Sequence, residues 1–198
     1  VLVILALIAI FANFLAPYSY SKQNLIHQFE PPSKQFLLGT DEYGRDILSR
    51  LIFGARISLL IGFIAVGIAL VSGGTLGAIA GYYGGVVDEV IMRIMDILLS
   101  IPSTLLAISI AATLGPGLFN LMIAVGLSSL PQYARVIRGS VLSLREQEFV
   151  EAAKAVGSSN FRIILKHIIP NCMAPIIVQS TLGVAMAILT ASGLSFIG

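Results

Sequence analysis

Long apolar runs alternate with shorter polar segments along the whole chain. The apolar runs cover residues 1–16, 57–80, 97–114, 118–130 and 172–194, and no charged residue lies in the middle of any of them. A helix of about 20 apolar residues crosses the hydrocarbon core of a bilayer. The pattern therefore predicts an all-α fold, a polytopic transmembrane helical bundle with about five spans.

The chain begins inside an apolar run at Val1 and stops at Gly198, just after another. We therefore expect a fragment that lacks both natural ends. A signal peptide is the alternative interpretation of residues 1–16. It is less favoured because the run continues to Pro17 without a clear cleavage site of small residues.

The most polar of the segments between apolar runs covers residues 145–170. Its first half has the spacing of an amphipathic helix, with Phe149, Ala152, Ala153 and Val156 on one face and Arg145, Glu148, Glu151 and Lys154 on the other. Gly157 can end this helix in a left-handed conformation. Residues 158–160 offer a cap for a second helix that runs toward Pro170. The segment predicts two short helices bent at a glycine.

Two interpretations of these short helices remain open on the pattern alone. The face built from Ala152, Ala153 and Gly157 has little side-chain bulk, so that a docked partner can approach its backbone closely. Alternatively, the first helix lies on lipid headgroups with its arginines in the interface.

The same segment resembles the EAA loop of ABC importer permeases. The shared pattern is Glu-Ala-Ala at 151–153, three residues, Gly157, nine residues, and then His-Ile-Ile-Pro at 167–170. That loop usually has an apolar residue where His167 stands and Leu where Ile169 stands. A final His-x-x-Pro-Asn, as at 167–171, is usual in the peptide and nickel branch.

The resemblance to peptide and nickel permeases extends over nearly the whole chain and is also strong at 38–62 and 81–102. Residues 46–56 suit an amphipathic helix before the second span, in which Asp46 can pair with Arg50. A solvated interfacial helix whose arginines bind lipid phosphates is the alternative. The closing Leu-Ser-Phe-Ile-Gly resembles the segment before the family's last span, so a sixth span is expected to be missing.

Glycines recur at four-residue spacing in the second span. Gly73, Gly77 and Gly81 form one helical stripe, which lets a neighbouring helix backbone come close in lipid. No lysine follows where a phosphate-binding loop would need it. Close helix packing is the expected role, and residues 81–85 are expected to form a turn with two interfacial tyrosines.

Two polar, proline-containing patches interrupt the third and fourth apolar runs. A broken helix at membrane depth is tolerated where it lines a cavity. The candidate pathway residues are Ser100, Pro102 and Ser103 in the first patch and Ser128, Ser129 and Gln132, beside Pro131, in the second. Packing at an ordinary kink is the alternative for each of them.

Composition narrows the function classes. Only 11% of residues are charged, against about 25% in soluble domains, and the net charge of +2 implies no nucleic-acid partner. The lone Cys172 is expected to be a small buried hydrophobe. No catalytic, cofactor-binding or metal-binding motif is present, so we do not expect an enzyme. The spans also lack the carboxylates and histidines of an ion-coupled secondary transporter, which is the main alternative, and the paired groups of a membrane-embedded enzyme.

The resemblance implies a permease subunit of an ATP-driven importer for dipeptides, oligopeptides or nickel, in a bacterial-type inner membrane. A second, similar permease, two cytoplasmic ATPase subunits that use the ATP, and an external substrate-binding protein are the implied partners. The expected ATPase-coupling residues are Glu151, Ala152, Ala153 and Gly157, with Arg145 and Glu148 on the rim and Phe149 and Val156 on the buried face.

The expected organisation has two parts. Residues 1–56 hold the first span, an external polar segment and the amphipathic helix, and residues 57–198 hold the permease core. The core includes a cytoplasmic loop at 135–171. Its side is implied by the resemblance, because the count of Lys and Arg gives only a weak bias.

Overall fold

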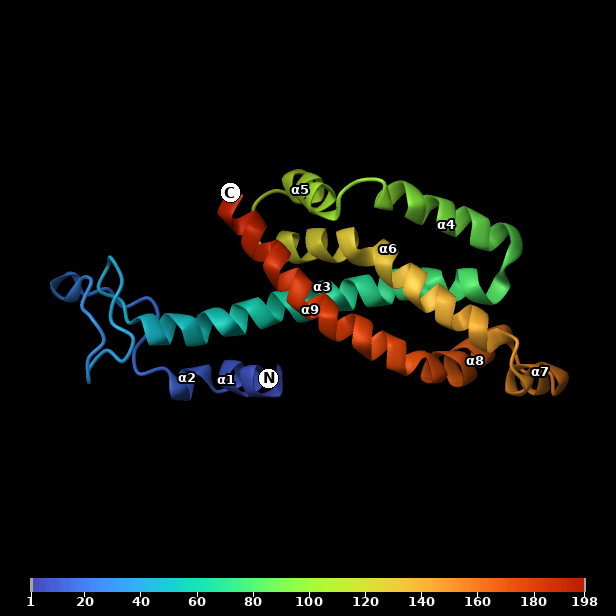
Figure 1. Cartoon of the computed structure of the whole chain (residues 1–198), viewed down its shortest axis with the longest axis horizontal. Helices are drawn as coiled ribbons and strands as arrows, with labels where there is room; N and C mark the ends of the chain where they lie inside the picture. The colour runs from blue at the N-terminus through green and yellow to red at the C-terminus, as the bar shows by residue number, and fades with distance from the viewer. Residues whose placement is uncertain (1, 198) are drawn as a thin grey trace. The chain divides into compact units, whose positions relative to one another are not determined.

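The computed structural model describes residues 2–197, which are mostly α-helical and form no β-strand. The all-α prediction is confirmed. The α-helices are α1 (Leu2–Ile10), α2 (Ala12–Leu15), α3 (Ile47–Tyr83), α4 (Gly85–Leu99), α5 (Ser103–Leu114), α6 (Leu118–Arg145), α7 (Glu148–Ala155), α8 (Asn160–Ile163) and α9 (Met173–Ile197) (Figure 1). Short 3-10 turns cover Leu25–His27 and Ile169–Cys172, and a π turn covers Ile164–Ile168.

The chain forms two compact units, residues 1–60 and 61–198, whose boundary falls inside α3. The sequence-based division after residue 56 stays a prediction. The region from 47 to 83 contains no proline, so the amphipathic helix and the second span are one continuous helix rather than two.

In the first unit, the polar segment folds around buried Phe36, whose ring packs on Tyr18 and His27 with centroids 5.4 and 5.6 Å away. Asp46 then starts α3. Its carboxylate accepts hydrogen bonds from the backbone N–H and the hydroxyl of Ser49, at 2.8 and 2.6 Å. This is the geometry of a side-chain cap at a helix N-terminus.

The expected ion pair between Asp46 and Arg50 does not form, because the Asp46 carboxylate caps the helix. Arg50 and Arg45 both pair with Asp41 instead, Arg45 at 2.7 Å. Burial acts to raise the pKa of Asp41, but hydrogen bonds from Arg45 and from the backbone N–H of Tyr43 outweigh it and lower this pKa to about 2.

Within the described residues, two segments are long and apolar enough to cross a membrane, α3 and Asn160–Phe196. A third counts if α4 and α5 are one broken span. The helix α6 is 28 residues long but carries more polar side chains, and α1 has nine residues. The structure agrees with a helical membrane bundle, and the number of five spans stays a prediction.

The predicted break at Pro102 is confirmed, but the third span is not one helix from 97 to 114. α4 ends at Leu99, and α5 starts at Ser103 after a bend of 90°. The 12 residues of α5 extend about 18 Å, which is shorter than the roughly 30 Å core of a bilayer.

Two prolines, Pro131 and Pro170, lie inside continuous helical segments. α6 continues through Pro131, although it changes direction partway along its length (Figure 1), as proline-containing helices do. Pro170 does not end its helix either. The π turn before it, in which the backbone N–H of Ile169 bonds to the carbonyl of Ile164, widens the backbone where the proline ring would otherwise clash.

The glycine stripe of α3 packs directly against α6, as predicted. A Cβ added to Gly73 or Gly77 would lie 2.3 or 2.2 Å from the carbonyl oxygens of Leu130 and Ala134. At Gly81 it would meet the Arg138 carbonyl at 2.9 Å. Only glycine permits this distance between the two backbones. α6 also contacts α4, α5 and α9, which makes it the central helix of the second unit.

Candidate functional site

The bend between α7 and α8 has the capping geometry that the sequence predicts. Gly157 has a φ of +76°. The N–H of Ser158 donates to the carbonyl of Ala153 (3.0 Å) and the N–H of Gly157 to that of Lys154 (2.9 Å), which together form a Schellman motif. The Ser159 hydroxyl accepts from the N–H of Arg162 and caps α8. Hydrogen bonds therefore fix the angle between the two helices.

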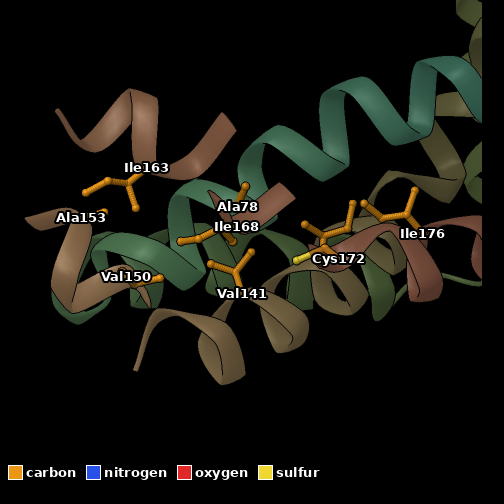
Figure 2. Packing of buried hydrophobic residues seen from close by; sticks show 9 residues of the cluster. Ala78, Val141, Val150, Ala153, Ile163, Ile168, Cys172 and Ile176 are labelled. Carbon is orange, nitrogen blue, oxygen red and sulfur yellow. The ribbon is translucent and has the colours of Figure 1, made fainter. Parts of the chain in front are cut away.

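The short helix α7 packs by one narrow face against the rest of the second unit. Val150 is fully buried, and Ala153 is 7% exposed. Both belong to a continuous hydrophobic cluster, the seat cluster, shown in Figure 2. Its members come from α3, α6, α7, α8, α9 and the turns before α9: Ala78, Ile137, Val141, Val150, Ala153, Ile163, Ile168, Cys172 and Ile176. The predicted burial of Cys172 is confirmed.

The predicted buried face of α7 is wrong in two positions. Phe149 is 38% exposed and Val156 is 81% exposed, while Val150 takes the buried place. Apolar residues lie on several sides of this helix, so the 3.6-residue period leaves the buried side undecided until the neighbours are known. Phe149, Ala152 and Val156 consequently form an exposed apolar strip, the α7 strip, and Phe161 of α8 is 73% exposed.

The two predicted rim residues lie in different places. Glu148 begins α7 and is exposed, as is Glu151 one turn later. Arg145 ends α6 instead of starting the next helix, and its guanidinium donates to the carbonyl of Gly81 at 3.1 Å. Arg145 therefore joins α6 to α3 rather than edging the α7 strip.

Tyr82 is a residue of this site that the sequence does not reveal. The expected turn at 81–85 is reduced to Gly84 (φ +66°), and Tyr82 lies within α3. Its hydroxyl donates to the side-chain oxygen of Asn160 at 2.9 Å, and the Lys154 ammonium lies 5.8 Å from its ring centroid. Tyr82 thus ties both α7 and α8 to the end of α3.

The structure also shows ion pairs between α4 and α6 that the sequence does not predict. Arg138 donates two hydrogen bonds to the two carboxylate oxygens of Asp88, and Arg135 donates to Asp96 at 2.6 Å. The Asp88 pair joins residues 50 positions apart. The sequence does not single out these partners, because Asp88 and Asp96 share α4 with Glu89 and Arg93.

The structure brings together two of the six candidate pathway residues. Ser129 and Gln132 line a cavity of about 210 Å³ between α3, α6 and α9, together with Tyr133, Gln179 and Gly183. Ser128 is buried in helix packing. Ser100, Pro102 and Ser103 are exposed at the break between α4 and α5, away from this cavity. The pathway role stays a prediction for all six.

These features describe a helical membrane protein with a bent pair of short helices, partly exposed, held against its central helix. The family described as "Binding-protein-dependent transport system inner membrane component" matches residues 73–198, and "N-terminal TM domain of oligopeptide transport permease C" matches residues 1–32. The chain belongs to the family of binding-protein-dependent transport system inner membrane components. Members of this family are permease components of ABC transporters and not enzymes. The resemblance seen in the sequence is confirmed.

Several relatives have peptide-related names. The chain is 53% identical to the dipeptide transport system permease protein DppC of Alkalihalophilus pseudofirmus, over 97% of this chain and 63% of the relative. It is 47% identical to the di/tripeptide transport system permease protein DppC of Pseudomonas aeruginosa (96% and 65%), and 43% identical to the oligopeptide transport system permease protein OppC of Bacillus subtilis (100% and 65%). The chain thus spans just under two thirds of the length of these relatives.

Proposed function

We propose that this chain is the larger part of a permease subunit that forms half of the transmembrane pathway of an ATP-driven peptide importer in a bacterial inner membrane. A second homologous permease completes the pathway, two cytoplasmic ATPase subunits supply the energy, and an external binding protein delivers the substrate. The names of the relatives favour peptides over nickel. The chain itself needs no cofactor, because ATP is used by the partner subunits.

The observation that carries the proposal is the combination of a fixed seat and an exposed strip in α7. Val150 and Ala153 hold the helix in the seat cluster, and the Schellman motif fixes its angle to α8. The α7 strip stays exposed on the same helix. A short amphipathic helix that offers an apolar face to a groove is a common mode of docking. We assign this strip to the ATPase subunits.

The packing of α7 in the seat cluster determines which parts of the chain move when the ATPase subunits close. Interlocked side chains in a packed cluster move together, since protein interiors are close-packed. When the ATPase subunits close, α7 moves as a rigid body with the cytoplasmic half of α6, and the break near Pro102 and the bend in α6 take up the change in direction. In this arrangement the segment 135–171 is cytoplasmic and the segment 17–56 is largely external.

Gly157 offers a test of the coupling role with a matched control. No atom lies within 4 Å of a Cβ added at Gly157, so the constraint there is its positive φ alone. Valine in this conformation costs about 1–2 kcal/mol, whereas asparagine tolerates it. In the full-length transporter, we expect Gly157→Val to lower uptake of a labelled dipeptide several-fold per ATP hydrolysed, and Gly157→Asn to preserve it. Equal uptake per ATP in the wild type and Gly157→Val would contradict the proposal.

A further inference from the structure

The helix α4 makes little apolar contact with the rest of the second unit. All of its residues are described by the structure, and Met95 is its only buried side chain. An apolar row on α4 is exposed instead: Val87, Val90, Ile94 and Ile97 are 43–59% exposed. Hydrophobic packing therefore contributes little to holding α4 in place, and the attachment has to come from other contacts.

Two arginines of α6 supply that attachment, and a third holds the end of α3 just before α4, in antiparallel order. Arg145 at the end of α6 donates to the carbonyl of Gly81, just before α4 begins. Arg138 makes a bidentate contact with Asp88 in the first turn of α4, and Arg135 pairs with Asp96 near the C-terminal end of α4. A guanidinium that binds both oxygens of a carboxylate fixes orientation as well as distance.

The same stretch of α6 also bears the seat of α7. Ile137 and Val141 belong to the seat cluster with Val150 and Ala153. Only residues 146 and 147 separate the end of α6 from the start of α7. One face of α6 thus contacts the proposed docking helix, and another holds the helix that ends at the 90° break before α5.

We propose that Arg138–Asp88, supported by Arg135–Asp96, positions α4 on α6 and transmits the movement of α7 to the break between α4 and α5. These four are positioning residues. The inference rests on the proposed coupling role of α7, and it adds the contacts by which that movement reaches the broken helix.

The test measures distance in the complete transporter, assembled with its ATPase subunits. Spin labels on Ile97→Cys and Val178→Cys report how far the end of α4 lies from α9, and both positions are 59% exposed. The native Cys172 is fully buried, which protects it from the label. The distance distribution is recorded without nucleotide and with ATP plus vanadate. The wild type should change its distance on ATP binding.

The Asp88→Asn and Arg138→Gln variants should each reduce the ATP-driven change in the two-state distance equilibrium by roughly 2- to 30-fold, which is typical of residues on a coupling route. The exchanged pair Asp88→Arg with Arg138→Asp should restore it. Glu89→Gln and Arg93→Gln are matched controls on α4. Both are exposed and outside the ion pairs found among the described residues, and both should respond as the wild type does.

A wild-type response in both single variants, or no rescue by the exchange, overturns the inference. If the Asp88 variants do not assemble, Asp96→Asn decides, because an ion pair that is half exposed is expected to contribute little to stability. A smaller reduction supports the inference and an unchanged response overturns it. The proposed function fails separately. In that case the wild type shows no ATP response, whereas failure of this inference alone leaves a wild-type response that Gly157→Val reduces.

Discussion

The central helix α6 contacts α3 and α4 by opposite means. Toward α3 it presents backbone carbonyls, against which Gly73 and Gly77 leave no room for a side chain. Toward α4 it presents long arginine side chains that reach Asp88 and Asp96. Both contacts come from the same helix, yet one is made of backbone atoms and the other of flexible charged groups.

This difference indicates how each neighbouring helix is held to α6. Two backbones in van der Waals contact have no side chains that can rearrange between them, so α3 and α6 must move together. The arginine–aspartate pairs fix the ends of two side chains to each other, so α4 is carried along with α6 through these pairs. The α3–α6 contact is held by backbone packing, and the α4–α6 contact by ion pairs.

The largest effect is expected where the backbones touch. In Gly77→Ala the new Cβ lies 2.2 Å from the Ala134 carbonyl oxygen, and we expect a loss of about 3 kcal/mol from overpacking. Gly67→Ala in the same helix meets no atom within 4 Å and should be neutral or stabilising by about 0.5–1 kcal/mol. Thermal unfolding in detergent measures both. Equal melting temperatures would show that the α3–α6 contact is not rigid.

A medium effect is expected at the seat of α7, the third surface that α6 contacts. Val150 is fully buried among its cluster partners, so Val150→Ala should lower the free energy of unfolding by about 1–3 kcal/mol through the cavity it leaves. Val156→Ala removes a side chain that is 81% exposed and should change stability by less than about 0.5 kcal/mol. Chemical unfolding curves compare the two. Similar losses would mean that the seat and the strip are wrongly distinguished.

Double-mutant cycles sharpen the comparison on the α4 side. The Asp88 and Arg138 side chains are 16% and 33% exposed, so their coupling energy should be about 1–2 kcal/mol, as for hydrogen bonds to charged groups. Asp96 and Arg135 are 51% and 54% exposed and should couple by less than about 1 kcal/mol. Unfolding free energies of the single and double alanine variants give both values. The reverse order would place the main attachment at Asp96.

The smallest effect concerns charge pairs within one loop rather than between helices. The pKa of Asp41 is lowered to about 2, so its contribution to stability is fully present above about pH 3.8 and is lost as the pH falls toward 2. Arg45→Gln should move this pKa back toward 3.8, and Lys34→Gln should not. A carboxyl carbon NMR titration of Asp41 measures it. An unchanged value in Arg45→Gln would show that the pair does not hold the loop.

Local signals in the sequence predicted the local features of the fold. The left-handed Gly157, the cap at Ser159, the break at Pro102 and the glycine stripe each depend on residues within a turn or two of the position. Propensity and spacing are sufficient for such features.

Features that depend on a distant neighbour could not be predicted. The choice of Val150 over Val156 as the buried residue is made by α6, α8 and the π turn that follows α8, and the Arg138–Asp88 pair joins two helices far apart in sequence. The π turn that accommodates Pro170 has no sequence pattern of its own. The candidate site was thus found by its motif, while its orientation required the structure.

Cross-linking from Val156 tests most directly whether the α7 strip is the docking face for the ATPase subunits. In the assembled transporter, a cysteine at the exposed Val156 should cross-link to an ATPase subunit, and one at the exposed Lys22, in the segment expected outside, should not. The buried Cys172 gives no competing product. Failure of Val156→Cys to cross-link, or labelling of both positions from the same side by a membrane-impermeant reagent, would contradict the account.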